Sequence, residues 1–292
     1  MAAATSPRKQ PLTWLITGCS SGFGLAFART TQSHGHNVIA TSRIGSRTPE
    51  LVVEITGRGG RWLTLDYTDA NCGQVVENLE AEGTKIDVLV NCAGIARSGP
   101  IECFSEAEVR NLMETNFYGP FRLIKAMAPY MRRRRSGAIV NISSGAGMEA
   151  RNTLGMYGAS KAALDGMSKV LHKEMKDFNV RVLLVYLGTF NTEMLSKVNR
   201  VEHPLDADYQ GTITKKNFDV LTTGDFAAPG DHEKAVQAIY DVIMGEGVGA
   251  GLDRELMIPL GVDMAERVKE TQDRLTHMMD VFGDICNNVN IG

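Results

Sequence analysis

The chain has 292 residues, 43% of them hydrophobic, and its formal net charge is −3. This length and composition favour one large domain with a substantial core and argue against extensive disorder. The negative balance argues against non-specific binding to nucleic acid, which needs a basic face. The five cysteines never occur in Cys-x-x-Cys spacing, so neither a metal site nor a disulfide framework is expected.

The first residues of the chain, 1–11, are mostly small or polar and are interrupted by proline. They are expected to form a flexible N-terminus ahead of a single dinucleotide-binding catalytic domain over residues 12–292. They lack the apolar centre of a signal peptide. No run in the chain approaches the ~18 apolar residues that a membrane span requires. These features predict a soluble, cytoplasmic protein.

Short apolar runs rich in β-branched residues alternate with helical patterns of about 12–25 residues. The runs are almost continuously hydrophobic, as in Val88–Val90, which is typical of strands covered on both faces. The alternation predicts an α/β fold, a doubly wound (Rossmann) parallel sheet of about seven strands with helices on both faces. The expected strands are Trp14–Thr17, Asn37–Ser42, Arg61–Leu65, Val88–Asn91, Ala138–Ser143, Arg181–Tyr186 and Glu255–Pro259.

The first predicted strand runs into a glycine-rich turn, Thr17–Gly24. Its glycines permit a tight turn and a close approach of the backbone to phosphate, and the following helix offers free N–H groups and a positive dipole end. Any strand-to-helix turn can use glycine, but this one follows the first strand of an alternating pattern. It therefore predicts nucleotide binding, through Gly18, Ser20, Ser21, Gly22, Phe23 and Gly24.

The end of the second predicted strand bears on the choice of cofactor. Enzymes that select NAD place an acidic residue there, about 20 residues past the glycines. This chain instead has Ser42, which can donate to a phosphate, and Arg43, which can pair with one. The alternative is a solvent-facing arginine without a ligand. The pattern favours NADP(H), bound through its 2′-phosphate.

Tyr157 and Lys161 lie four residues apart within the helical pattern Leu154–Lys176. Positions i and i+4 share one face of a helix, so the ammonium can lie beside the phenol. A nearby cation lowers the pKa of a phenol from about 10 towards neutrality, which suits it to proton transfer. An exposed helix pair without a function would have the same spacing. The strand Ala138–Ser144, which ends in hydroxyls shortly before the helix, favours the catalytic interpretation.

Together these motifs resemble the short-chain dehydrogenase/reductase family, of the ordinary Tyr-x-x-x-Lys type, from about Leu12 to at least Gly188. Five family motifs occur in order. They are Thr-Gly-x-x-x-Gly-x-Gly at Thr17–Gly24, Asn-x-Ala-Gly at Asn91–Gly94, the helix asparagine Asn116, the serine strand and Tyr157-x-x-x-Lys161.

The resemblance implies a role for each matched residue. Tyr157 would be the general acid in carbonyl reduction, while Lys161 would lower its pKa and bind the nicotinamide ribose. Asn116 would hold a water that links Lys161 to solvent. Ser144, chosen over Ser143 by its interval to the tyrosine, would hydrogen-bond the substrate oxygen. The further implied cofactor contacts are Asp66, Asn91, Ala93, Gly94, Gly188 and Thr192, with Tyr157 and Lys161 themselves.

Two positions depart from the family pattern. Cys92 stands where asparagine is usual, and Leu187 stands where proline usually precedes Gly188. The missing proline predicts a looser backbone beside the reactive ring. The polar segment 190–230 follows directly, after the carboxyl end of a strand, and is expected to be a substrate-binding flap or else a surface excursion without a role.

The expected function is that of an NADPH-dependent oxidoreductase that reduces a ketone or aldehyde to an alcohol, or the reverse. Region 231–292 also resembles larger, NADP-preferring members of the family, which implies a bulky, mostly apolar substrate. Two alternatives remain open: a non-redox isomerisation or cyclisation on the same fold, and an NADP-binding sensor without turnover. The resemblance also implies a homodimer or homotetramer, formed through the long predicted helices Glu106–Arg134 and Tyr157–Asp177.

Overall fold

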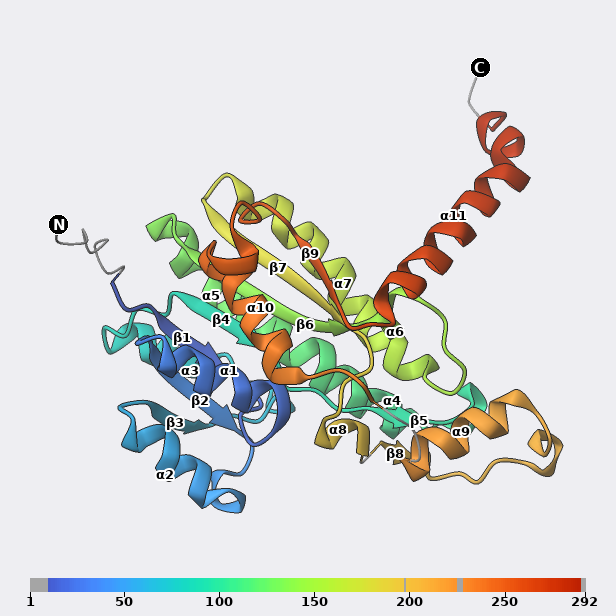
Figure 1. Ribbon diagram of the computed structural model, residues 1–292, viewed down its shortest axis with the longest axis horizontal. Coiled ribbons are helices and arrows are strands. Elements are labelled where there is room, and N and C mark those ends of the chain that lie inside the picture. Colours follow the sequence, from blue (N-terminus) through green and yellow to red (C-terminus); the bar gives the residue numbers. More distant parts are fainter. Residues whose placement is uncertain (1–9, 197, 225–227, 290–292) are drawn as a thin grey trace, which may run out of the picture.

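The computed structural model describes residues 10–196, 198–224 and 228–289. Most of the predicted flexible N-terminus, residues 1–11, lies outside these ranges, as do residues 197 and 225–227 of the predicted flap. The described chain forms a central sheet between helices, and one long C-terminal helix projects away from the body (Figure 1).

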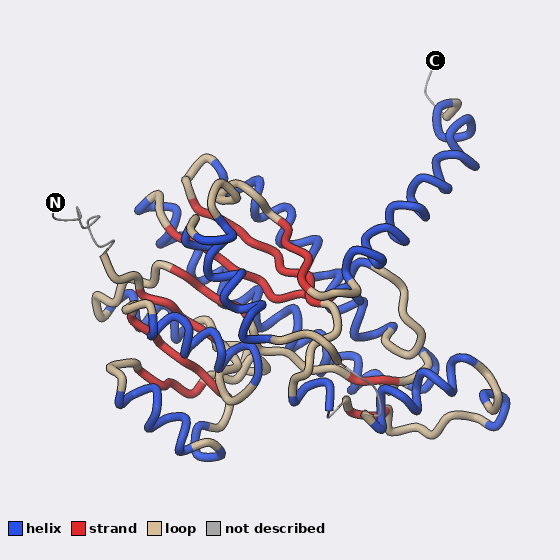
Figure 2. The backbone as a smooth tube through the Cα atoms, in the orientation of Figure 1, coloured by secondary structure: helices blue, strands red, loops and turns tan. Residues whose placement is uncertain are grey.

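A seven-stranded parallel sheet forms the centre of the molecule (Figure 2). Its strands are β1 Thr13–Ile16, β2 Asn37–Ser42, β3 Arg61–Thr64, β4 Val88–Asn91, β6 Gly137–Ser144, β7 Val180–Leu187 and β9 Met257–Leu260. Their order in space is β3-β2-β1-β4-β6-β7-β9, so the chain moves outward from β1 to β3 and then crosses back to β4. Such a reversal creates a crevice at the carboxyl ends of β1 and β4, where open sheets bind ligands. The predicted doubly wound fold is confirmed.

Helices of the crossover connections cover both faces of this sheet, and shorter helices follow its carboxyl ends (Figure 1). The α-helices are α1 Gly22–Ser33, α2 Pro49–Gly57, α3 Gln74–Ala81, α4 Glu106–Met113, α5 Gly119–Arg134, α6 Gly145–Met148, α7 Gly155–Lys176, α8 Glu193–Ser196, α9 Ile213–Thr223, α10 His232–Met244 and α11 Met264–Asn287. Two short strands, β5 Arg97–Ser98 and β8 Asn199–Arg200, form a separate parallel pair.

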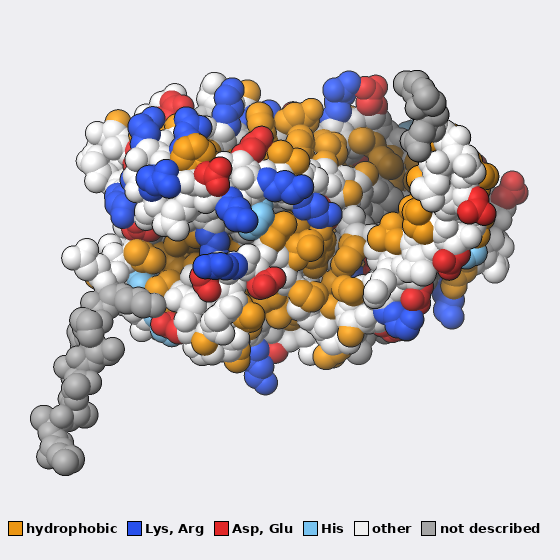
Figure 3. All heavy atoms as spheres, turned by 90° about the horizontal axis from the view of Figure 1, so that it is seen from above, with side chains coloured by type: hydrophobic (Ala, Val, Ile, Leu, Met, Phe, Trp, Pro, Cys, Tyr) orange, Lys and Arg blue, Asp and Glu red, His pale blue; other side chains and the backbone are white. Residues whose placement is uncertain are grey.

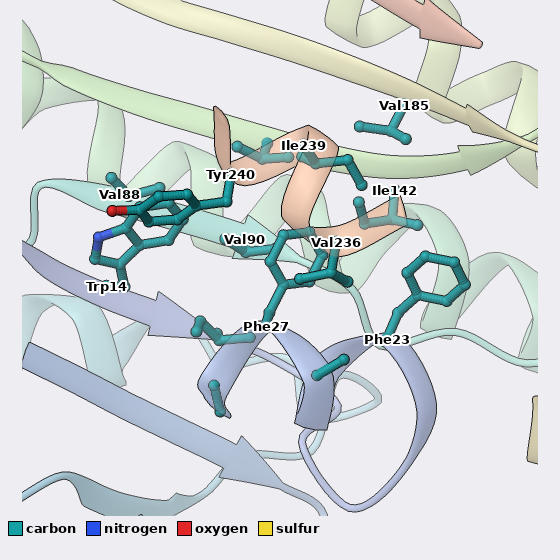
Figure 4. Close-up of a cluster of buried hydrophobic side chains, with 14 of the residues drawn as sticks. Trp14, Phe23, Phe27, Val88, Val90, Ile142, Val185, Val236, Ile239 and Tyr240 are labelled. Atoms are coloured by element: carbon teal, nitrogen blue, oxygen red, sulfur yellow. The ribbon is translucent and has the colours of Figure 1, made fainter. Parts of the chain in front are cut away.

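Side chains that alternate along the strands bury a core on each face of the sheet. Trp14 and Ile16 of β1 belong to the core shared with α1 and α10, where Trp14 stacks on Tyr240 with ring centroids 5.8 Å apart (Figure 4). Leu15, between them, belongs to the core shared with α3, α5 and α7. Both faces of β1 are therefore covered, and the polar ends of the strands are left to form the site.

Two predicted elements differ from the structure. The helix expected over Glu106–Arg134 is divided by a π-helical turn at Glu114–Tyr118, a local widening that is frequent at functional sites. The segment 190–230 is not merely a polar excursion, because it contains α8, β8 and α9. β8 pairs with β5, and Phe218 of α9 is buried with Val201 in a small apolar cluster. The sequence shows no long periodic pattern there because these elements are short.

The surface seen from the side to which α11 projects carries basic, acidic and hydrophobic side chains together (Figure 3). Lys and Arg are interspersed with the others on this face and do not form one continuous basic surface. In the part of the chain that the structure describes, no helix combines the length and the apolar character needed to cross a bilayer.

Candidate active site

The glycine turn after β1 is closely packed against the loop after β4. Gly18 and Gly22 have φ values of +74° and +51°, which favour glycine. A Cβ on Gly24 would lie 2.3 Å from the Gly18 carbonyl oxygen, so α1 can begin here only because residue 24 has no side chain. Ser21 precedes α1 without capping it through its side chain, which leaves N–H groups of the first helical turn available to an anion.

A chain of buried hydrogen bonds runs beneath this turn from β1 to α7. The Tyr67 hydroxyl donates to Asn91 Oδ1 at 2.8 Å and lies 2.7 Å from Thr17 Oγ1. Asn91 Nδ2 donates to Asn141 Oδ1 at 2.8 Å, and Asn141 Nδ2 donates to Ser168 Oγ at 2.8 Å. Buried polar groups that are all partnered in this way hold neighbouring strand ends in fixed positions. Asn91 thus has a structural partner on each side, and sequence reasoning missed Tyr67.

Two arginine side chains that follow β2 line the cavity that the glycine turn also lines. Ser42 is buried, and its hydroxyl accepts a hydrogen bond from Trp62 Nε1 at 3.1 Å, so its own proton stays available. Arg43 and Arg47 are both exposed cavity-lining residues, and among the described residues neither has a carboxylate partner. The sequence predicts Ser42 and Arg43 at this place but gives no sign of Arg47, which a 3-10 turn brings back to the cavity.

Tyr157 lies at the opposite part of the cavity, beside the end of β6. Burial raises the pKa of Tyr157, while a hydrogen bond from Ser144 and the charge of Arg267 lower it. The sequence predicts that Lys161 lowers this pKa. In the structure the buried Lys161 ammonium donates to the Ile142 carbonyl oxygen at 2.9 Å, and the positive charge that lowers the pKa of Tyr157 is that of Arg267.

Lys161 also reaches the loop after β4. A Cβ on Gly94 would lie 3.5 Å from Lys161 Nζ and 3.2 Å from Asn116 Oδ1, so both side chains approach the same glycine. Burial lowers the pKa of Lys161 to about 8, against a smaller raising effect of Asp165. An ammonium with that pKa can exchange its proton near neutral pH.

Asn116 sits in the π-helical turn, fully buried and with every amide contact made inside the protein. Its Oδ1 accepts from Ile95 N, and its Nδ2 donates to Ile95 O and to Ser160 Oγ, each at 2.9 Å. The widened turn lets one side chain bridge the loop after β4 and α7. Asn116 and Asn91 do not line the cavity, unlike the other predicted site residues.

The N-terminal end of α11 is hydrogen-bonded to the loop after β7. Asp263 accepts from Thr189 N at 3.1 Å and from Thr189 Oγ1 at 2.7 Å. Arg267 contacts Asp263 at 2.5 Å and Glu149 at 3.0 Å, and its side chain is 8% exposed. A Cβ on Gly188 would lie 2.0 Å from Asp263 Oδ1. The loose backbone expected from the missing proline is thus tied down by a carboxylate 74 residues away.

Residues from the flap complete one cavity of about 1340 Å³. Thr192 lies above the glycine turn, 3.7 Å from where a Cβ on Gly22 would stand. Several apolar side chains of the flap line the cavity, and ionic side chains from outside the flap line it as well. These lining residues are Met194, Val198, Val220 and Leu221, and Glu149, Arg151, Asp263 and Arg267.

The structure therefore gathers most of the predicted site around one cavity. The predicted residues that line it are Gly18, Ser20, Ser21, Gly22, Phe23, Gly24, Ser42, Arg43, Asp66, Ala93, Gly94, Ser144, Tyr157, Lys161, Gly188 and Thr192. Within the described residues there is no cluster of three His, Cys, Asp or Glu side chains that could hold a metal ion.

Comparison with known proteins identifies this arrangement. The family model described as short chain dehydrogenase matches residues 13–203. The chain belongs to the short-chain dehydrogenase family. Members of this family are oxidoreductases that bind nicotinamide cofactors, which agrees with a glycine turn at the switch point of the sheet.

Two curated relatives of this short-chain dehydrogenase are similar over 63% of its length. The oxidoreductase claN of Passalora fulva is 42% identical over 185 residues, which are 63% of this chain and 84% of that protein. The 3-ketodihydrosphingosine reductase of Bacteroides thetaiotaomicron is 41% identical over 184 residues, 63% of this chain and 65% of that protein.

Solved structures extend the similarity of this short-chain dehydrogenase to nearly its whole length. A short-chain dehydrogenase from Streptomyces avermitilis is 31% identical, with a TM-score of 0.85 over 97% of this chain and 100% of that one. One from Sphingobium yanoikuyae in complex with NADPH is 25% identical, with a TM-score of 0.71 over 92% and 95%. A third, from Burkholderia phymatum in complex with NAD, shares the fold at 20% identity and a TM-score of 0.74 over 91% and 95%.

Proposed function

We propose that this protein is an NADPH-dependent reductase of bulky, mostly apolar ketones or aldehydes, in which Tyr157 is the general acid and base. The observation that carries the proposal is the single cavity that joins the glycine turn, the Arg43 guanidinium and the Tyr157–Ser144 pair. In such a cavity a dinucleotide can lie with its phosphates at one end and its reactive ring near the phenol.

The residues present fit a nicotinamide dinucleotide. The turn around Gly18 and Gly22 has the backbone conformation and the uncapped helix start that bind a pyrophosphate. Arg43 and Arg47 offer two planar guanidinium groups to a further phosphate, and no acid stands at the end of β2 to bind ribose hydroxyls. These features support NADPH over NADH. When bound, this cofactor supplies a hydride to the carbonyl carbon.

The protein's own residues would then donate the proton to the carbonyl oxygen and stabilise the negative charge that develops on it. Ser144 and Tyr157 can donate hydrogen bonds to one carbonyl oxygen, which stabilises the alkoxide as it forms. Tyr157 passes its proton to that oxygen, and the Arg267 charge stabilises the phenolate that remains. We assign the return of a proton to Lys161, whose pKa is lowered to about 8 and whose ammonium lies beside Gly94.

The flap supports the proposed substrate class. Met194, Val198, Val220 and Leu221 contribute apolar side chains to the lining of the cavity. An apolar wall with a few convergent polar groups is typical of small-molecule sites. A similar protein is named a 3-ketodihydrosphingosine reductase, which by its name reduces a keto compound and agrees with the proposed reaction.

The test is a panel of ketones and aldehydes ordered by size, with NADPH and NADH oxidation followed by absorbance. We expect turnover of large apolar ketones with NADPH and at least tenfold lower kcat/KM with NADH. Cofactor binding without oxidation on any carbonyl would refute the reductase proposal and favour the sensor. Conversion of a substrate without any change in NADPH would instead favour the isomerase or cyclase.

A further inference from the structure

Helix α11 leaves the body of the molecule after its first turn (Figure 1). Of its 24 residues only Met264 and Arg267 are buried. At 1.5 Å per residue the helix is about 36 Å long, so most of it projects without tertiary packing. Helices gain most of their stability from packing of an apolar face, and those that lack it are marginal in water. The projecting part therefore lacks a packing partner within the described chain.

The apolar residues of α11 recur at heptad spacing. Val268, Leu275 and Phe282 are seven residues apart and take heptad position a. Thr271, Met278 and Ile285 each lie three residues later and take position d. This is the a/d pattern of helices that pair in coiled coils. We call this set the α11 seam: Val268, Leu275, Met278, Phe282 and Ile285 within the helix, with Thr271 at one of its positions and Val289 two residues beyond the helix end. From Leu275 onward its side chains are 48% to 74% exposed. On a globular protein, a continuous exposed apolar stripe of this kind usually marks a surface that binds a partner.

Two residues beside the seam widen its apolar face, and from Leu275 to Val289 no charged side chain lies on this face to repel a second copy. Met279 and Val281 flank it and are each about half exposed. From Leu275 to Val289 the exposed apolar side chains present on the order of 800 Å² per copy, close to the share of each partner in a standard-size interface. The charged residues of this part, Asp280 and Asp284, lie on the other side of the helix at heptad positions f and c.

We propose that α11 pairs with α11 of a second copy of this chain, in antiparallel orientation about a twofold axis. The seam is self-complementary in this register: Leu275 packs against Ile285 of the second copy, and Met278 packs against its Phe282. The twofold axis then repeats both layers. This surface is separate from the predicted family interface through α5 and α7, and the proposal does not depend on the proposed function.

A lipid surface is the other partner that an exposed amphipathic helix can take. Helices that bind at membrane surfaces usually carry Lys and Arg on the polar face. Beyond Arg274 the chain has no Lys or Arg up to Val289, and it has two aspartates, both within α11. Anionic lipid would repel this face, so the charges favour a protein partner.

The first test is the mass of the full-length protein in solution, measured by size-exclusion chromatography with light scattering. We expect the double variant Leu275→Glu, Phe282→Glu to have half the mass of the wild type. The control Thr276→Glu, His277→Glu places the same charges on the polar face and should keep the wild-type mass. An unchanged mass of the seam variant would overturn the proposal. Wild-type binding to phosphatidylserine vesicles that the seam variant lacks, with equal masses for both, would also overturn it.

The second test uses the exposed native Cys286, which lies at heptad position e. In the proposed register, position 272 of one copy faces Cys286 of the other. Gln272→Cys should therefore give a disulfide-linked dimer on mild oxidation, seen on a non-reducing gel. Asp273→Cys, one residue further round the helix, should not, and neither should Gln272→Cys combined with Cys286→Ser. Equal crosslinking of the 272 and 273 variants, or none at 272, would overturn the antiparallel pairing.

Discussion

Replacing Arg267 by methionine removes the only cation that contacts both Glu149 and Asp263 among the described residues. The guanidinium is 8% exposed and Glu149 is 7% exposed, so solvent cannot take over its role. Removing one partner of a buried ion pair costs about 3–5 kcal/mol, because a buried charge is left without compensation. Arg151, 3.6 Å from Glu149, compensates that carboxylate in part. We therefore expect Arg267→Met to lower the free energy of unfolding by about 2–3 kcal/mol at pH 8.

The loss should depend on pH in a direction that the structure fixes. Burial already raises the pKa of Glu149, and the charge of Arg267 opposes that rise. Without Arg267 the pKa of this carboxyl rises further, so protonation relieves the buried charge as the pH falls. The cost of Arg267→Met should therefore be smaller at pH 5 than at pH 8.

Urea unfolding followed by circular dichroism measures both effects. Arg274→Met, two turns further along α11 at an exposed position, is the matched control and should change stability by less than about 0.5 kcal/mol. In activity assays the pH optimum of Arg267→Met should move upward, since Arg267 no longer lowers the pKa of Tyr157. If Arg267→Met and Arg274→Met cost the same at pH 8, the reasoning about the buried ion pairs is refuted.

Three further predictions concern the cofactor, pH dependence and the turn. Arg43→Ala should weaken NADPH binding at least tenfold and leave NADH binding unchanged in fluorescence titrations, since a charged hydrogen bond contributes about 1.5–3 kcal/mol; equal losses for both cofactors would contradict the 2′-phosphate site. Burial raises the pKa of Asp165 to about 6, so the folded state holds this proton more tightly than the unfolded state. The proton on this carboxyl stabilises the folded state most below about pH 4, and this contribution is lost as the pH rises through 6. The stability difference between wild type and Asp165→Asn should therefore fall by about 2.4 kcal/mol from pH 4 to pH 7 in urea unfolding; a flat difference would contradict it. Gly24→Ala should abolish NADPH binding, because the added methyl would meet the Gly18 carbonyl, whereas Gly166→Ala in α7, where nothing lies within 4 Å, should bind normally and serve as the control; normal binding by Gly24→Ala would show that the turn tolerates a side chain.

The sheet and the cofactor end of the site could be predicted because local rules determine them. A glycine turn after the first strand acts through its own backbone, so neighbouring residues such as Gly18 and Gly24 suffice to recognise it. That Tyr157 and Ser144 line the same cavity could be predicted because a helix and a strand end project their side chains in known directions. Each of these predictions rests on residues within one or two elements.

The rest of the site depends on contacts between residues far apart in the chain. Thr189 is held by Asp263, which lies 74 residues later. The sequence of α11 does not mark Arg267 as buried. It stands among residues that are exposed in the structure, and its burial results from contacts with distant residues. Lys161 illustrates the limit of spacing arguments: four residues after Tyr157 it shares a helix face with the phenol, yet its ammonium bonds to a strand carbonyl. Which partner a long side chain takes is decided by packing rather than by register.

The most direct test of the proposed chemistry is the rate of NADPH oxidation by Tyr157→Phe on a ketone that the wild type reduces. A positioned general acid contributes about 10²–10⁴-fold, so we predict a loss of that size in kcat. NADPH affinity and the free energy of unfolding, measured on the same sample, should stay close to the wild-type values. A variant that keeps the wild-type kcat within a few-fold would contradict the assignment of Tyr157 as the proton donor.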